Sequence, residues 1–169
     1  MEEQQYIDYF ENLCRQSLDI NHEVDGKKAF FYLDNPDNTD EIDNAFRNQI
    51  QYPAFILDAP AGMVSGNGSA NYTDSPVGSF TVLCQAKTPE EVRQARDRSK
   101  SIGISFLARM NKDARENKIV AGKRINFVIN DNAYEPMNFP AHQLYGYVFE
   151  FLFVCPFGFS SDSGTWRDI

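Results

Sequence analysis

The segment from Leu144 to Val154 restricts the possible folds of this chain more than any other part of the sequence. Every second residue in it is aromatic, and the residues between are mostly aliphatic. A two-residue period predicts a β-strand. Because both faces are apolar, the strand must lie inside a sheet or be covered on both sides. Glu150 is the exception, and we expect it to face solvent or a neighbouring subunit rather than to act in catalysis.

Four further strands and three helices are predicted from the rest of the chain. Short apolar runs bounded by Gly or Pro indicate strands, and apolar residues three and four apart indicate helices. The predicted strands are Ala29–Leu33, Ala54–Leu57, Ser79–Lys87 and Arg124–Asn130, and the predicted helices are Glu2–Asp19, Asp40–Gln49 and the residues after Thr88 to about Asn117. The last helix has the clearest start, because Thr88, Pro89 and Glu91 form a capping-box sequence.

The connections complete a prediction of the fold class. Gly62 to Gly78 is rich in Gly, Ser and Asn and predicts a long glycine-rich hairpin loop. Glu135 to His142 contains two prolines and predicts an irregular connection, while Pro156 to Ile169 is expected to be a loosely held tail. We therefore predict a single α+β domain over residues 1–169, with its core in 1–155. A mainly antiparallel, mixed sheet would carry the N-terminal helix and the long amphipathic helix.

Charge and hydropathy argue against several classes of function. The 169 residues contain 16 Lys and Arg against 24 Asp and Glu, which gives a formal charge of −8. An acidic surface disfavours sequence-specific or general binding to nucleic acid, because phosphates are gripped by basic groups. No apolar run reaches the ~20 residues that a membrane span needs. The acidic N-terminus does not resemble a secretory signal, so a cytoplasmic location is expected.

Cysteine and histidine do not form a metal-binding pattern. Cys14, Cys84 and Cys155 are far apart, and His22 and His142 are the only histidines. A zinc site usually needs closely spaced pairs of ligands. We therefore expect three free, packed thiols and no metal or cofactor.

One arrangement of side chains could support catalysis. Asp58 ends a predicted strand, and Gln85 and Lys87 end the next one. This resembles the restriction-endonuclease-like pattern, in which acids on neighbouring strands bind Mg²⁺ and a lysine assists the attacking water. The predicted hairpin would place Asp58 near Lys87. Gln85 stands where an acid is usual, however, and a neutral amide weakens cation binding.

The order of elements resembles that of phage tail terminator (tail completion) and head–tail joining proteins. The matching segments, similar in pattern only, are Tyr52–Leu57, Gly78–Cys84, Thr88–Glu91 at the start of the long helix, and Tyr145–Glu150. The segment from Ala29 to Gln49 is an addition to this layout. The resemblance implies a non-enzymatic structural protein that forms a ring and contacts other phage structural proteins, in the bacterial host or in the virion.

Within that resemblance, the glycine-rich loop would contact a neighbouring subunit. Its candidate contact residues are Gly62, Ser65, Gly66, Asn67, Gly68, Asn71 and Tyr72. The acidic balance would suit a lumen through which DNA slides, although the charge could equally serve solubility alone. The alternatives that remain open are the Mg²⁺-dependent nuclease and a generic interaction domain with an exposed aromatic patch.

Overall fold

The structure is a computed structural model, and it describes residues 1–23, 25–35, 50–68, 71–129 and 132–160. Its helices are α1 (Glu3–Gln16) and α3 (Pro89–Arg115), with a short 3-10 turn at Pro140–His142. Its strands are β1 (Phe30–Leu33), β2 (Ala54–Asp58), β3 (Ala61–Gly66), β4 (Tyr72–Gln85), β5 (Asn126–Val128), β6 (Tyr134–Phe139) and β7 (Leu144–Phe157). The helix predicted over Asp40–Gln49 lies outside the described residues.

The strands form one seven-stranded sheet in the order β1-β2-β4-β7-β5, with β3 beside β4 and β6 beside β7. All neighbouring pairs are antiparallel except β1 and β2, so the sheet is mixed. This confirms the predicted α+β fold. β7 lies between β4 on one side and β5 and β6 on the other, as its two apolar faces require.

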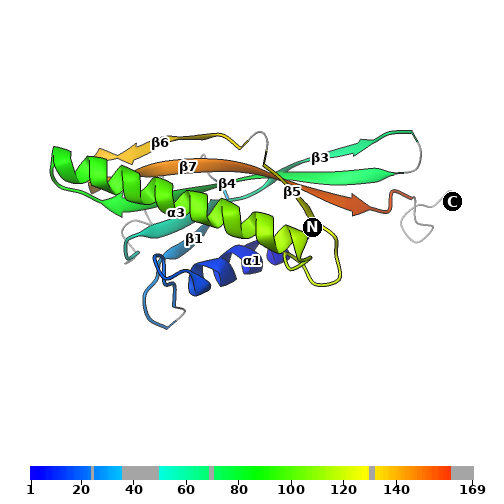
Figure 1. Cartoon of the computed structure of the whole chain (residues 1–169), viewed down its shortest axis with the longest axis horizontal. Coiled ribbons are helices and arrows are strands. Elements are labelled where there is room, and N and C mark those ends of the chain that lie inside the picture. The colour runs from blue at the N-terminus through cyan, green and yellow to red at the C-terminus, as the bar shows by residue number, and fades with distance from the viewer. Residues whose placement is uncertain (24, 36–49, 69–70, 130–131, 161–169) are drawn as a thin grey trace.

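Both helices pack on the same face of the sheet (Figure 1). The core beneath them is a cluster of aromatic rings from α1 and from the central strands. Phe10, Phe55 and Phe80 are fully buried, and the Phe55 and Phe80 rings stack with centroids 4.7 Å apart. The aromatic face of β7 contributes Phe149 and Phe153 to the same cluster. These aromatic residues therefore build the core rather than a binding surface.

The start of α3 confirms the predicted capping box. The Thr88 hydroxyl oxygen accepts a hydrogen bond from the Glu91 backbone N–H at 3.2 Å, and the Glu91 carboxylate accepts one from the Thr88 N–H at 3.3 Å. Farther along α3, Gly103 lies directly on the sheet. A Cβ atom at Gly103 would come within 2.1 Å of the Phe149 ring. The absence of a side chain there lets the helix approach the strands closely.

The opposite face of the sheet carries a smaller apolar cluster. Leu33, Ile56, Leu83 and Leu144 are buried in it. This explains why Leu83 interrupts the polar side of its strand, and it confirms that this face is also partly covered.

Two segments that we expected to be irregular are strands. Most of Gly62–Gly78 belongs to β3 and β4, which pair from Ala61–Val77 to Gly66–Tyr72. The prediction of a long loop is therefore wrong, and only residues 67–71 connect the two strands. Both strands are rich in small and polar residues, so they lack the alternation by which a half-buried strand is recognised.

The second such segment is β6, which was predicted as part of an irregular connection. Pro136 lies opposite Tyr147 in the pairing of β6 with β7. An edge strand tolerates proline because the nitrogen, which carries no hydrogen to donate, can face away from the partner strand. The predicted tail also begins too early, since β7 continues through Pro156 to Phe157.

Candidate functional site

A long ribbon of strands projects from one end of the molecule. It consists of β3, residues 72–78 of β4 and residues 152–157 of β7, and we call it the arm. In Figure 1 it extends beyond the ends of both helices. Tyr72 pairs with Phe157 and Val77 with Leu152, so β4 lies in the middle of the arm, with β3 on its other side. The arm is thus a continuation of the central sheet: Phe153 at its base packs against Tyr9 and Phe10 of α1, and its far part lies beyond the helices (Figure 1).

A β-bulge marks the point where the arm leaves the body. In the sheet register, Leu57 pairs with Phe80 and Ala61 pairs with Val77. Between these two pairs, the chain from β2 to β3 has three residues, whereas β4 has only two. The extra residue lies in the segment that contains Ala59 and Pro60. Bulges bend a strand and increase its twist. The bulge therefore redirects the hairpin relative to the body of the sheet.

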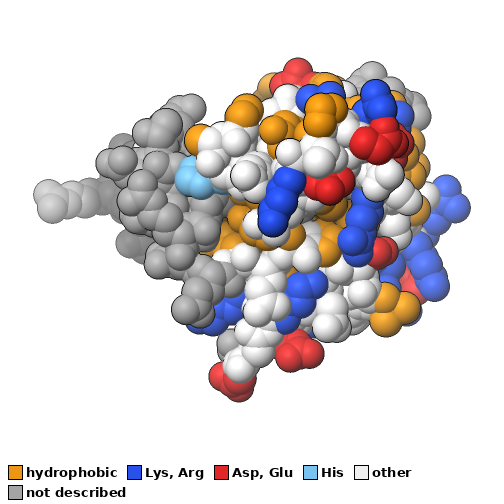
Figure 2. Space-filling model, turned by 90° about the vertical axis from the view of Figure 1, so that its left-hand side faces the viewer, with side chains coloured by type: hydrophobic (Ala, Val, Ile, Leu, Met, Phe, Trp, Pro, Cys, Tyr) orange, Lys and Arg blue, Asp and Glu red, His pale blue; other side chains and the backbone are white. Residues whose placement is uncertain are grey.

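The arm carries a single charged residue, Asp74, whose carboxylate pairs with the N-terminal ammonium group of Met1 at 3.1 Å. Every residue of β3 is exposed, with Met63 at 63% and Val64 at 56% of full exposure. Val77 is 44% exposed and faces the same side as Met63, opposite to the helices. No charged residue occurs from Ala59 to Thr73. At the far end, where α3 begins, charged side chains of both signs are interspersed instead (Figure 2).

The predicted contact residues all lie on this arm or on the connection that joins its strands β3 and β4. Gly62, Ser65 and Gly66 belong to β3, Tyr72 begins β4, and Asn67, Gly68 and Asn71 lie between the two strands. The Ser65 and Thr73 hydroxyl groups share a hydrogen bond of 2.9 Å across the hairpin. The sequence analysis missed Met63, Val64 and Val77, although the uncharged stretch from Ala59 to Thr73 was a visible signal.

The structure does not bring the candidate nuclease residues together. Asp58 lies beside Ser79, near the start of the body portion of β4, whereas Gln85 ends that strand opposite Leu144. Ser79 and Gln85 are six residues apart along β4, which corresponds to roughly 20 Å. Lys87 lies beyond Gln85, so the expectation that the hairpin places it near Asp58 is wrong. In an antiparallel hairpin the end of one strand meets the start of the next. In the described part of the chain, no group of three His, Cys, Asp or Glu could hold a metal ion.

Asp58 instead takes part in a local contact between strands. The Ser79 hydroxyl donates a hydrogen bond of 2.5 Å to its carboxylate, and the Tyr6 hydroxyl donates one of 3.2 Å to its backbone carbonyl. Burial raises the pKa of the Asp58 carboxyl above its usual value, and the Ser79 hydrogen bond opposes this shift only in part.

The Asp58→Asn variant is expected to be more stable than the parent protein at pH 7. A raised pKa means that burial penalises the ionised carboxylate, while an amide oxygen can still accept the Ser79 hydrogen bond. The penalty is absent below the unfolded-state pKa of ~3.9 and grows as the pH rises to the folded-state pKa. The difference in urea midpoint between the two proteins should therefore shrink as the pH falls towards 4. Asp97→Asn, an exposed change of the same charge, should show no such trend, and an Asp58→Asn variant less stable than the parent at every pH would contradict the expectation.

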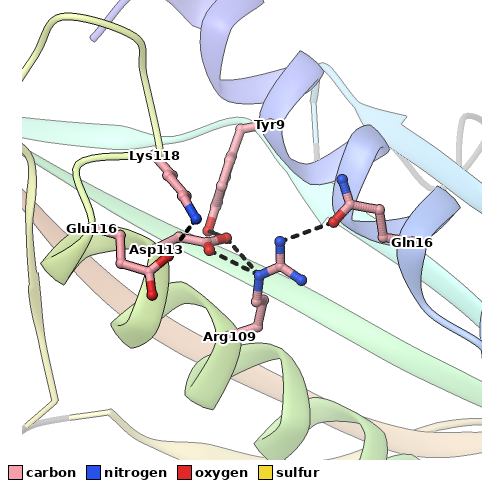
Figure 3. A network of polar contacts seen from close by, with 6 residues as sticks. All are labelled: Tyr9, Gln16, Arg109, Asp113, Glu116 and Lys118. Atoms are coloured by element: carbon pink, nitrogen blue, oxygen red, sulfur yellow. Dashed lines mark hydrogen bonds and ion pairs between the residues drawn. The ribbon is translucent and has the colours of Figure 1, made fainter.

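A network of polar side chains joins α1 to α3 (Figure 3). The carboxylate of Asp113, 3% exposed, accepts hydrogen bonds from Arg109 Nε at 2.8 and 2.9 Å and from the Tyr9 hydroxyl at 3.2 Å. Arg109 also donates from Nη2 to the Gln16 side-chain oxygen at 2.9 Å. Burial, together with the nearby Asp113 carboxylate, raises the pKa of Tyr9, so its hydroxyl remains a donor. The network holds the two helices together.

The three cysteines are free and buried, as expected. Burial raises the pKa of Cys84 to about 11 and also raises the pKa values of Cys14 and Cys155. Thiols in this state are poor nucleophiles at neutral pH. They act as small apolar side chains in the packing.

Comparisons with known proteins assign no family to the chain. No family model matches it, and no curated protein is significantly similar to it. Across the described residues, neither helix is long and apolar enough to cross a membrane. The architecture and the surface of the arm are therefore the basis for a functional proposal.

Proposed function

We propose that this protein is a non-enzymatic assembly protein of the phage tail terminator or head–tail joining kind, and that copies of it associate through the arm. The observation that carries the proposal is the exposed, uncharged edge strand β3 in a chain with a formal charge of −8. The ring, the phage partners and the location in the bacterial host or the virion come from the resemblance in the order of elements.

The edge of β3 is suited to pairing with another strand. Proteins usually protect an exposed edge with charged residues, proline or a covering loop. Ala61–Gly66 contains neither a charge nor a proline, and within the described residues β3 has a strand partner on one side only. Backbone N–H and C=O groups on the free side can therefore add a strand from another molecule.

The distribution of charge favours contact between copies at this place. Identical chains of charge −8 repel one another over most of their surfaces. The stretch from Ala59 to Thr73 contributes nothing to that repulsion. Met63 and Val77, exposed on one face, supply apolar area that association would bury. If β3 pairs with a different edge of the next copy, the contact repeats from head to tail, and it gives a ring when the rotation between neighbouring copies closes.

The test is the molar mass in solution as a function of protein concentration. The parent protein is expected to form oligomers of defined size in sedimentation-velocity and light-scattering measurements. Met63→Lys should shift the equilibrium to monomers and weaken association at least tenfold, because it buries a charge in the contact. Its side chain is largely exposed, so the fold should be unaffected.

Leu18→Lys is the matched control, since Leu18 is 97% exposed, lies away from the arm and undergoes the same change of charge. This variant should associate like the parent. A parent protein that stays monomeric at high concentration would overturn the proposal, as would equal effects of the two substitutions. The nuclease alternative has no comparable support, because Asp58 and Lys87 lie far apart.

A further inference from the structure

A second feature, separate from the edge of β3, is a groove of about 650 Å³ between the last turns of α3 and strand β5. Among the residues that the structure describes, Arg115 and Arg124 line it and no acidic residue does. Amide groups of Asn111, Asn117 and Asn126 add hydrogen-bonding capacity. The apolar part of the lining includes Phe127, whose ring packs against Phe153 with centroids 6.0 Å apart. The groove is therefore basic and polar at its sides, with an apolar part next to the sheet.

The groove lies in a basic stretch of an acidic chain. From Arg109 to Arg124 there are six Lys and Arg against two Asp and Glu, a formal charge of +4 where the whole chain has −8. Both acids are already paired, Asp113 with Arg109 and Glu116 with Lys118. Within the described part of the structure, the guanidinium groups of Arg115 and Arg124 are exposed and have no ion-pair or hydrogen-bond partner. Two cations are thus left available at the groove.

The strand beside the groove also has an available edge. β5 pairs with β7 from Asn126–Val154 to Val128–Leu152 and, among the residues that the structure describes, is the last strand of the sheet on that side. Ile129, which follows β5 and lines the groove, is 50% exposed. A strand edge flanked by apolar and charged side chains is the arrangement that binds extended peptides, since backbone groups provide affinity and side chains provide selectivity.

We propose that this groove binds an extended, acidic peptide segment of a partner protein. The segment would pair with the free edge of β5 and place carboxylates on Arg115 and Arg124. Arginine suits this task because its planar guanidinium can form two parallel hydrogen bonds with a carboxylate. A peptide fits better than a nucleic acid, because only a polypeptide backbone can pair with a strand edge and because the −8 charge of the chain repels a polyanion.

The proposal is tested with fluorescently labelled, end-capped octapeptides in which glutamate alternates with valine or threonine, titrated with the full chain in an anisotropy assay. The glutamate peptides are expected to bind with micromolar affinity. The same peptides with glutamine in place of glutamate should bind at least tenfold more weakly. Peptides methylated at alternate backbone nitrogens should also lose binding, because they cannot pair with the edge of β5.

Two double variants locate the site. Arg115→Gln with Arg124→Gln should weaken binding of the glutamate peptides at least tenfold. Arg93→Gln with Arg98→Gln removes the same charge from the other half of α3 and should leave binding unchanged. Equal losses in both variants, no binding of any glutamate peptide at 1 mM protein, or tighter binding of a single-stranded oligonucleotide that depends on Arg115 and Arg124 would each overturn the proposal.

Discussion

The Gly146→Ala variant is expected to lose at least about 3 kcal/mol of its free energy of unfolding, the upper range for overpacking a core. An alanine Cβ atom would lie 1.9 Å from the carbonyl oxygen of Val82 and 2.8 Å from the Ser99 hydroxyl oxygen. The first of these atoms belongs to the backbone of the central strand β4 and cannot rotate away. The two central strands must therefore separate to accept a single methyl group.

The loss should be large because Gly146 lies where α3 is attached to the sheet. The Ser99 hydroxyl, fully buried, donates a hydrogen bond of 2.7 Å to the Val82 carbonyl and accepts one of 2.9 Å from the Tyr147 N–H. A displaced Val82 carbonyl would break the first bond and strain the second. The added cost is that of buried polar groups left without partners.

Urea unfolding followed by circular dichroism measures the effect. Gly158→Ala is the matched control, because a Cβ atom there meets nothing within 4 Å, and this variant should be as stable as the parent. If Gly146→Ala unfolds within about 1 kcal/mol of the parent, against the range expected for overpacking, the close approach of β4 to residue 146 is refuted. Should the variant not fold at all, Ser99→Ala offers a milder test of the same attachment, with an expected loss of about 1–3 kcal/mol.

The second large effect is expected for Asp113→Ala, which should lower the free energy of unfolding by about 2 kcal/mol. The substitution leaves the buried hydroxyl of Tyr9 without an acceptor, which costs about 1–3 kcal/mol for a buried donor. Arg109 loses its partner too, but its side chain is 44% exposed and water can replace the carboxylate. Asp113→Asn should lose less, since its amide oxygen can still accept one of these hydrogen bonds.

A substitution in a neighbouring ion pair serves as the control, because it distinguishes the loss of the buried contact from the loss of an exposed ion pair. Lys118→Gln breaks the exposed ion pair with Glu116, which lies beside the network in Figure 3. Such a surface pair contributes little, and the variant should unfold at the parent's urea concentration. A loss for Lys118→Gln that equals the loss for Asp113→Ala would contradict the expectation, because it would show that breaking an exposed ion pair costs as much as breaking the buried contact.

The elements predicted correctly are those whose residue pattern follows directly from their own burial or from contacts within a few residues. The alternation in Leu144–Val154 identifies a central strand, because only a strand buried on both faces is apolar at every position. The capping box at Thr88 identifies the start of α3, because it acts within a few residues of its own position. The α+β fold follows from the order of these elements.

The failed predictions concern strands that are held by their partners alone. β3 is exposed, both β3 and the start of β4 are rich in small and polar residues, and β6 contains Pro136, so their composition is that of loops. Backbone hydrogen bonds to a neighbouring strand do not require particular side chains, so an exposed strand has no characteristic sequence pattern. The same reason explains Asp58 and Lys87, because the distance between them depends on the register of β2 against β4.

The sequence by itself determined the apolar pattern of the central strands, the limits of the long helix and the negative net charge. These properties are local or additive, and they are set by side-chain chemistry. Only the tertiary structure decided that an uncharged stretch becomes a projecting arm, and that Arg115 and Arg124 meet the edge of β5 in one groove. Those results depend on register, on the bulge before Ala61 and on helix packing, which join residues far apart in the chain.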